Sequence, residues 1–243
     1  MEKAIEIKNV SKSFMLPHEK NNSLKERFLH PFSKIEFEKI NVLKNVSCDI
    51  HQGEWVGVIG KNGCGKSTLL KIIAGVYTQD SGEVSVHGKL VPFLELGVGF
   101  NPELTARENI CLNGVILGMR RAKVVSRIPA IANYAGITKF LDQRLKNFSS
   151  GMQVRLAFAV AMQVTGDVYL LDEILAVGDA EFQAKSALEF ERLKSRGVTA
   201  IFVSHSTDSI LKHCDRVLWI ENGLLRMFGP ANEVIAAFVA NGY

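Results

Sequence analysis

A glycine-rich segment at residues 60–67 has the residue types and spacing to bind phosphate. It reads GKNGCGKS and matches GxxxxGK[ST], a pattern whose glycines let the backbone turn so that N–H groups surround phosphate oxygens. Lys66 supplies a cation for the β- and γ-phosphates of a nucleotide such as ATP, and the Ser67 hydroxyl can bind Mg²⁺. The residues expected to contact the nucleotide here are Gly60, Lys61, Asn62, Gly63, Cys64, Gly65, Lys66, Ser67 and Thr68.

The flanking sequence predicts the two elements that must position such a loop. Residues 55–59 (WVGVI) form an apolar run expected to be a buried strand, and residues 67–74 are expected to form a helix that Gly75 ends. The positive end of that helix would point at the phosphates. Because the pattern lies between a strand and a helix, a glycine-rich turn without function is a poor explanation of it.

Cys64 lies inside the loop and has two interpretations. It is either an inert small residue or a thiol whose ionisation is favoured by Lys66 and by the helix N-terminus. The sequence leaves both open.

A pair of carboxylates ends a second apolar run, at residues 168–173 (VYLLDE). Asp172 can reach a magnesium ion through its water shell, and Glu173 can orient or activate an attacking water. An acidic pair alone could equally be structural or cap a helix. Together with the upstream phosphate loop, it predicts nucleotide hydrolysis.

Further motifs follow in an order that resembles the ABC transporter ATPases. Residues 148–152 (FSSGM), followed by Gln153 and Arg155, are similar to the LSGGQxQR signature of that family and precede the acidic pair, as they do there. Residues 175–179 (LAVGD) resemble its D-loop. His205 follows the apolar run 201–204 and resembles its switch histidine. A histidine at a strand end is often structural, but the ordered set covers nearly the whole chain.

The resemblance implies an α/β fold: a P-loop NTPase core of the ABC ATPase type with an antiparallel β subdomain and an inserted α-helical subdomain. We expect residues 1–243 to form one such domain, with residues 97–165 as the helical subdomain. Alternation at residues 4–8 predicts an early strand, and Asn222-Gly223 predicts a late hairpin.

The signature residues are expected at the start of a helix over residues 153–164. Free N–H groups and the helix dipole make such an end attractive to an anion. The resemblance implies that Ser149, Ser150 and Gly151 contact ATP bound to the opposing subunit of a head-to-tail homodimer. Asp179 is expected to contact it as well. The alternative is a serine-rich helix cap with no further role.

Several positions depart from the family pattern or match it weakly. Ser150 and Met152 stand where the family signature commonly has Gly and Gln, which leaves contacts to the opposite ribose open. Ile174 stands where the family commonly has Pro after the acidic pair. No glutamine is identifiable as the Q-loop residue in 90–102, where Glu95 is the nearest polar candidate for a metal or coupling role. Phe14 resembles the residue that stacks on adenine, although it could belong to the core.

Residues 93–110 and the LAVGD segment look like the branch of ATPases that exports lipid-linked polysaccharides such as O antigens and teichoic acids. This resemblance implies an integral membrane permease, a lipid-linked glycan as cargo and a peripheral position at the cytoplasmic face of the cell (inner) membrane. Residues 18–39 form an expected insertion with a short amphipathic helix over 24–30. It would approach the membrane face, or be a surface loop only. No C-terminal carbohydrate-binding domain is expected.

Composition argues against several other classes of protein. The formal charge of +4 is too small to argue for nucleic acid, and the four cysteines have neither CxxC nor zinc-site spacing. No apolar run is long enough to span a membrane. The alternatives are an ABC ATPase for a different cargo and, less favoured, a soluble ABC-type ATPase that acts on nucleic acid.

Overall fold

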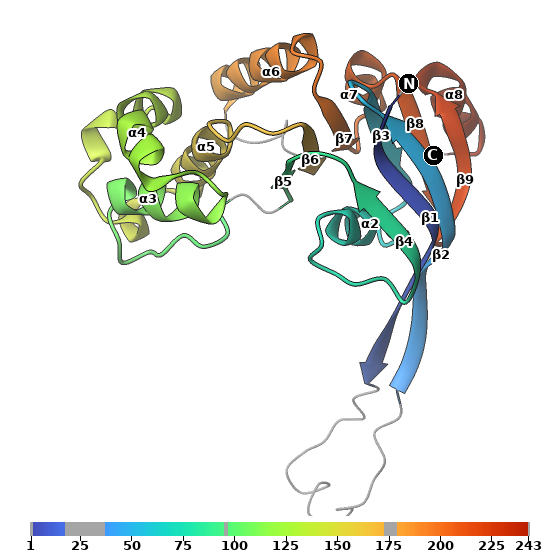
Figure 1. The fold of residues 1–243 in the computed structure, drawn as a ribbon. Helices are drawn as coiled ribbons and strands as arrows, with labels where there is room; N and C mark the ends of the chain where they lie inside the picture. Colours follow the sequence, from blue (N-terminus) through green and yellow to red (C-terminus); the bar gives the residue numbers. More distant parts are fainter. Residues whose placement is uncertain (1, 18–36, 95–96, 173–178, 243) are drawn as a thin grey trace, which may run out of the picture.

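The computed structural model describes residues 2–17, 37–94, 97–172 and 179–242, which form two sheets and a group of helices (Figure 1). The larger sheet has the order β5-β6-β7-β3-β8-β9, in which neighbouring strands run parallel except for the antiparallel pair β8 and β9. Its strands are β3 (Trp55–Ile59), β5 (Leu90–Phe93), β6 (Val168–Asp172), β7 (Thr199–Val203), β8 (Arg216–Glu221) and β9 (Leu224–Pro230). β3 and β7 are buried throughout, as parallel strands covered on both faces must be.

The smaller sheet is antiparallel, with the order β2-β1-β4. It comprises β1 (Lys3–Pro17), β2 (Phe37–His51) and β4 (Ser81–Val86). The strand predicted over residues 4–8 lies within β1, which is longer because it pairs with β2 from Lys3 to Pro17. The paired ends of β1 and β2 project from the body as an arm (Figure 1). Residues 37–39 of the expected insertion belong to β2, and its predicted helix at 24–30 lies outside the described residues.

Helix α2 (Lys66–Ile73) shares one hydrophobic cluster with both sheets. Its inward side chains contact strand residues of each sheet; the cluster includes Ile5, Ile7, Val56, Val58, Leu69 and Leu70. Burial on two sides fixes the helix relative to β3, and with it the loop that joins them.

Three helices form a unit beside the larger sheet (Figure 1). They are α3 (Ala106–Ile116), α4 (Arg121–Ala135) and α5 (Ser150–Ala161). α5 begins at Ser150 rather than at Gln153 as predicted, because the Ser149 hydroxyl accepts a hydrogen bond from the Met152 N–H at 3.2 Å and caps the helix one turn earlier. The predicted helical character of 97–165 therefore takes the form of three helices with short 3₁₀ turns between α4 and α5.

The remaining helices are α6 (Ala180–Ser195), α7 (Thr207–His213) and α8 (Ala231–Ala240). The predicted hairpin joins β8 and β9, and its turn residues Asn222 and Gly223 have φ values of 50° and 80°, as a two-residue turn with positive φ requires.

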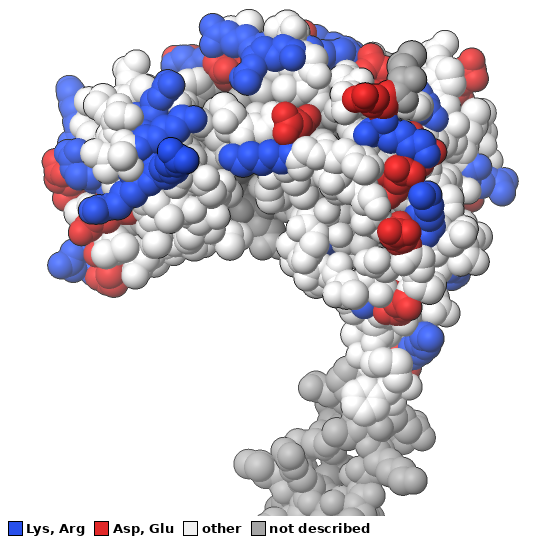
Figure 2. Space-filling model, viewed as in Figure 1, with Lys and Arg blue, Asp and Glu red and all other residues white. Residues whose placement is uncertain are grey.

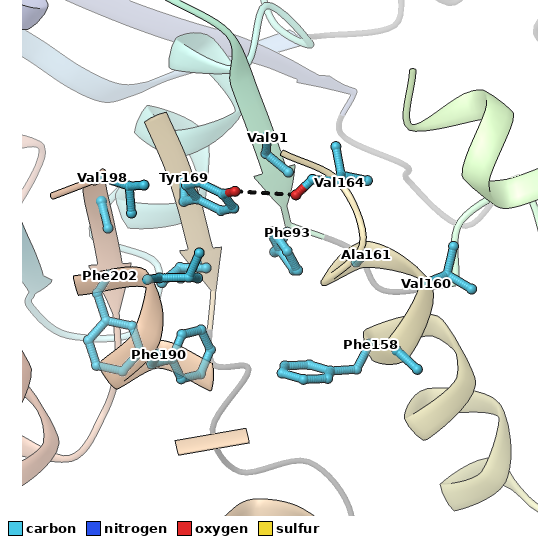
Figure 3. Packing of buried hydrophobic residues seen from close by; sticks show 14 of the residues in the cluster. Val91, Phe93, Phe158, Val160, Ala161, Val164, Tyr169, Phe190, Val198 and Phe202 are labelled. Atoms are coloured by element: carbon cyan, nitrogen blue, oxygen red, sulfur yellow. Dashed lines mark hydrogen bonds between the residues drawn. The ribbon is translucent and has the colours of Figure 1, made fainter. Parts of the chain in front are cut away.

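An aromatic cluster (Figure 3) joins α5 to α6, and Phe190 of α6 packs edge-on against Trp55 of β3 in the larger sheet, with 6.3 Å between the ring centroids. The Phe158 ring lies 5.4 Å from that of Phe182 and 6.1 Å from that of Phe190. Beyond the end of α5, the Tyr169 hydroxyl on β6 donates to the Val164 carbonyl at 3.2 Å. The helix that carries the signature residues is thus anchored along one side and at its far end.

Candidate active site

Three strands place the predicted site residues along one edge of the larger sheet. Val203 of β7 pairs with Val58 of β3 on one side and with Asp172 of β6 on the other. The phosphate loop follows β3, and His205 follows β7 by two residues. Since parallel strands end at the same edge, the loop, Asp172 and His205 lie at this carboxyl edge, where open α/β sheets bind ligands.

Lys66 is the buried cation of the loop. Its side chain is 7% exposed, and its Nζ donates to the carbonyls of Gly60 at 2.6 Å and Lys61 at 3.0 Å. An ammonium has three donors, so one remains after these two bonds. The lysine is therefore held by the backbone around it in a position to meet a phosphate.

Two glycines of the loop permit contacts that a larger residue would prevent. Gly60 has φ 147°, and a Cβ there would lie 2.2 Å from the Ile220 carbonyl oxygen. Gly65 has φ 113°, and a Cβ there would lie 2.8 Å from the Val42 carbonyl oxygen. The loop thus sits directly on β8 and β2. Gly63, in contrast, faces open space, as a backbone that approaches a ligand should.

A cavity of about 350 Å³ brings the loop together with two residues predicted from distant parts of the chain. It is lined by Phe14, Val42, Asn62, Gly63, Gly65, Lys66, Ser67, Thr68 and His205. Its lining includes both an aromatic ring, that of Phe14, and the cationic residue Lys66, a combination that suits a ligand with a flat base and a phosphate chain. The residues present fit ATP.

Phe14 is held in place by neighbours on β1 and after α2. Its ring meets that of Tyr77 edge-on at 5.5 Å between centroids. The Asp80 carboxylate accepts a hydrogen bond from the Ser13 N–H at 2.7 Å and pairs with Lys12 at 3.0 Å. These bonds from Ser13 and Lys12 hold the pKa of Asp80 at about 2. The backbone next to Phe14 is therefore fixed by a charged partner.

The Cys64 thiol is buried, with 7% of its surface exposed. Burial raises its pKa, and the nearby Lys66 opposes this only in part. A buried thiol with a raised pKa carries little thiolate. The structure therefore favours the inert interpretation of Cys64.

Asp172 is half-buried at the end of β6. Together with Ser67, which lines the cavity, it would offer oxygen ligands of the kind that Mg²⁺ prefers when phosphates provide the rest. Glu173 and Glu95, the predicted water-orienting residue and the predicted metal or coupling residue, lie outside the described residues, as do residues 175–178 of the D-loop.

The signature residues form an exposed helix end that does not line this cavity. Ser149, Ser150 and Gly151 are all exposed, and a Cβ on Gly151 would meet nothing closer than the Ser149 Oγ at 4.0 Å. Gln153 turns back and donates to the carbonyls of Leu145 and Phe148 at 3.3 Å. Within one chain, the signature and the phosphate loop are separate.

Asp179 is engaged at the start of α6. Its carboxylate accepts from the Phe182 N–H at 2.9 Å, which caps the helix, and pairs with Arg155 of α5 at 3.1 Å. The end of the D-loop is thus tied to the signature helix.

Sequence reasoning missed three residues around the site. Val42 lines the cavity, Tyr77 packs on Phe14, and Asp80 fixes the strand before it. Each reaches the site through tertiary contacts, and no local pattern marks it. The Asn222-Gly223 turn was predicted, but not that its Gly223 carbonyl accepts from the Lys44 N–H at 2.8 Å and supports β2 beside the loop.

The fold and the loop define a nucleotide-binding ATPase of the P-loop class. Residues 43–176 match the sequence model of the family described as ABC transporter, and relatives over 40% identical match nearly the whole chain. The chain belongs to the ABC transporter family, and its predicted role as an ATP-binding, ATP-hydrolysing subunit is confirmed at that level.

Two relatives of this chain are named as subunits of polysaccharide or teichoic acid export systems. The chain is 42% identical over 241 residues to the O-antigen export system ATP-binding protein RfbB of Klebsiella pneumoniae, covering 98% of each. It is 39% identical over 230 residues to the teichoic acids export ATP-binding protein TagH of Listeria innocua, covering 95% of this chain and 68% of that one.

Solved structures confirm the predicted fold class. The dimeric post-hydrolysis state of an ATP-binding cassette bound to ADP and Pi gives a TM-score of 0.73 at 23% identity, over 93% of this chain and 98% of that one. An ATP-binding subunit of an ABC transporter gives a TM-score of 0.74 at 22% identity, over 99% of this chain and 95% of that one.

Proposed function

We propose that two copies of this chain bind two ATP molecules between them, head to tail. The observation that carries the proposal is the separation of two complementary surfaces on one chain: a cavity with a buried lysine, and an exposed helix N-terminus at Ser149 that does not line it. In the opposite orientation, Ser149, Ser150 and Gly151 of one copy would meet the nucleotide in the cavity of the other. Asp179 would contact it from the same side.

Each residue then has one task in hydrolysis. Lys66 binds the β- and γ-phosphates, and Phe14 stacks on the adenine. Ser67 and Asp172 would hold Mg²⁺, which when bound neutralises charge that develops on the phosphates. Glu173 orients the attacking water and accepts its proton, and His205 contacts the γ-phosphate from the end of β7. Glu95 remains a candidate for a metal or coupling role.

The work that hydrolysis drives is proposed to be export of a lipid-linked polysaccharide through a separate integral membrane permease. The names of the relatives support O-antigen-type or teichoic-acid-type cargo. None of the helices among the described residues has the length and apolarity to cross a bilayer. The chain would act from the cytoplasmic face of the inner membrane, with residues 97–165 transmitting closure of the dimer to the permease and residues 18–39 approaching the membrane.

Replacement of the native chain in its own cells by a Glu173→Gln variant tests this function. We expect surface glycan to fall at least about tenfold, the loss expected when a general base is removed, while lipid-linked glycan accumulates inside the cell. Glu181→Gln, which changes an exposed carboxylate of α6 that pairs with Lys185, is the matched control. Normal surface glycan with Glu173→Gln would contradict the proposal, and retention of a different solute would assign another cargo.

A further inference from the structure

Charge is divided unevenly along the chain. Residues 97–165 carry nine Lys or Arg and three Asp or Glu, a net charge of +6, so all other residues together carry −2 of the chain's total of +4. The small net charge of the whole protein is therefore the sum of a strongly basic helical unit and a slightly acidic remainder. Such an asymmetry marks a surface for an anionic partner.

The few carboxylates of this unit are already engaged by other groups. They do not neutralise α4, because their partners are elsewhere: Glu103 pairs with Arg144 and Lys146, Asp142 with Arg107, and Glu108 caps α3 with Thr105. Of the other cations outside α4, Arg155 pairs with Asp179, and Lys139 lies exposed in the 3₁₀ turn after α4.

The excess charge gathers at the start of α4. Arg120, Arg121, Lys123 and Arg127 are exposed, and no ion pair joins any of them to a carboxylate of the described chain. Figure 2 shows several Lys and Arg side chains over the part of the molecule where α3 and α4 lie, with a few Asp and Glu side chains at its edge. Arg120, Lys123 and Arg127 follow each other at helical spacing and so share one flank. The first turn of α4 holds no acidic residue, so these cations also face the positive end of the helix dipole, which is unfavourable without a bound anion.

Aliphatic side chains lie exposed at the same end of the unit. Val115 and Ile116 at the end of α3 are 47% and 56% exposed. The two helices pack against each other and are joined by residues 117–120. Cations beside exposed aliphatic groups are typical of surfaces that lie on lipid headgroups, where the long side chains reach phosphates and the aliphatic groups contact the acyl boundary.

We propose that the α3–α4 end of the helical unit binds the anionic phospholipid headgroups of a membrane surface. This inference rests on the proposed action of the chain at a membrane, and it adds a direct lipid contact that needs no permease. An acidic segment of a protein would also satisfy the cations, but it would not account for the aliphatic neighbours.

Flotation of the purified full-length chain with lipid vesicles tests the contact. We expect binding to phosphatidylcholine vesicles that contain about one third phosphatidylglycerol, little binding to pure phosphatidylcholine, and loss of binding at high salt. The triple variant Arg120→Gln/Lys123→Gln/Arg127→Gln should bind roughly 100-fold more weakly, at about a fivefold loss for each cation removed near an anionic surface.

A second triple variant provides a control of equal charge. Lys8→Gln/Lys89→Gln/Arg226→Gln removes three exposed cations outside the helical unit and should retain binding within about threefold, as a small change in long-range charge allows. ATP hydrolysis and melting temperature in solution, measured on the same samples, should be unchanged in both variants. If the proposed ATPase function is wrong, the native chain will fail to hydrolyse ATP, whatever the flotation result. No binding to anionic vesicles, or equal losses in both variants, would overturn the lipid contact; binding only to an acidic permease segment would do the same.

Discussion

The phosphate loop and the signature helix end both offer backbone N–H groups to an anion, but they are built differently. The loop is enclosed: Gly60 and Gly65 lie against β8 and β2, and Lys66 is buried beneath it. The signature end is open, with Ser149, Ser150 and Gly151 exposed on a helix that is anchored on its other side. One surface is enclosed within the chain, whereas the other is open and, in the proposed dimer, meets the nucleotide of a second copy. Substitutions at either surface, or at the contacts that support it, test this difference.

The largest effect is expected from Lys66→Ala. Removal of the buried ammonium leaves the developing phosphate charge without its main protein cation, so ATP hydrolysis should fall by about 100-fold or more. Phosphate release by the purified chain measures it. Lys89→Gln, which changes an exposed lysine that does not line the cavity, serves as control. A comparable loss in the control would show that general positive charge, not the Lys66 position, matters.

Gly65→Ala should destabilise the chain by about 2–3 kcal/mol and weaken ATP binding, because it adds a Cβ at an unfavourable φ against fixed backbone. The crowding atoms are the Leu43 side chain at 2.7 Å and the Val42 carbonyl oxygen at 2.8 Å. Gly63→Ala has a positive φ but no neighbour within 4 Å, so it should cost only about 1 kcal/mol. Urea unfolding compares the two, and equal costs would refute the enclosed geometry of the loop.

Ser149→Asp separates helix capping from anion binding at the signature end. Aspartate caps a helix as well as serine does, so the melting temperature should not change. Its charge would repel the phosphate bound to the opposing copy and should reduce hydrolysis by about tenfold or more. ATP binding to a single chain should persist. Thr105→Asp places the same charge at the N-terminus of α3 and should leave hydrolysis intact. If both variants hydrolyse ATP normally, Ser149 only caps its helix.

Asp179→Ala tests the link between the D-loop and the signature helix. Loss of the cap on α6 should cost about 1 kcal/mol in the free energy of unfolding, and loss of the exposed pair with Arg155 should add little. Arg155→Gln, which removes the pair and keeps the cap, should be nearly neutral. Equal destabilisation by the two variants would mean that the ion pair dominates.

The smallest effect concerns Asp80 and pH. Its folded-state pKa of about 2 lies below the ordinary value of 3.8, so the stability it contributes is fully present above about pH 4 and is lost as the pH falls from there towards about pH 2. Asp80→Asn should therefore be less stable than the native chain at pH 7, with a difference that narrows below pH 4. Denaturant unfolding at several pH values measures it. A difference independent of pH would exclude the charged bonds to Lys12 and Ser13 as its cause.

Features encoded by neighbouring residues could be predicted from the sequence. The strand before the loop and the turn at Asn222-Gly223 were placed correctly, because apolar runs and turn residues act locally. The start of α5 was wrong by one turn, since the capping strength of Ser149 was underestimated. The length of β1 and the support of Phe14 by Asp80 could not be predicted, because both depend on pairing between distant segments.

The most direct test of the composite site is the mass of the Glu173→Gln chain in solution, measured by light scattering during gel filtration with and without ATP. If the signature end of one copy completes the site of another, ATP should convert this hydrolysis-deficient chain from monomer to dimer, and Ser149→Asp in the same background should prevent the conversion. A chain that binds ATP and stays monomeric, or a dimer that tolerates Ser149→Asp, would contradict the account.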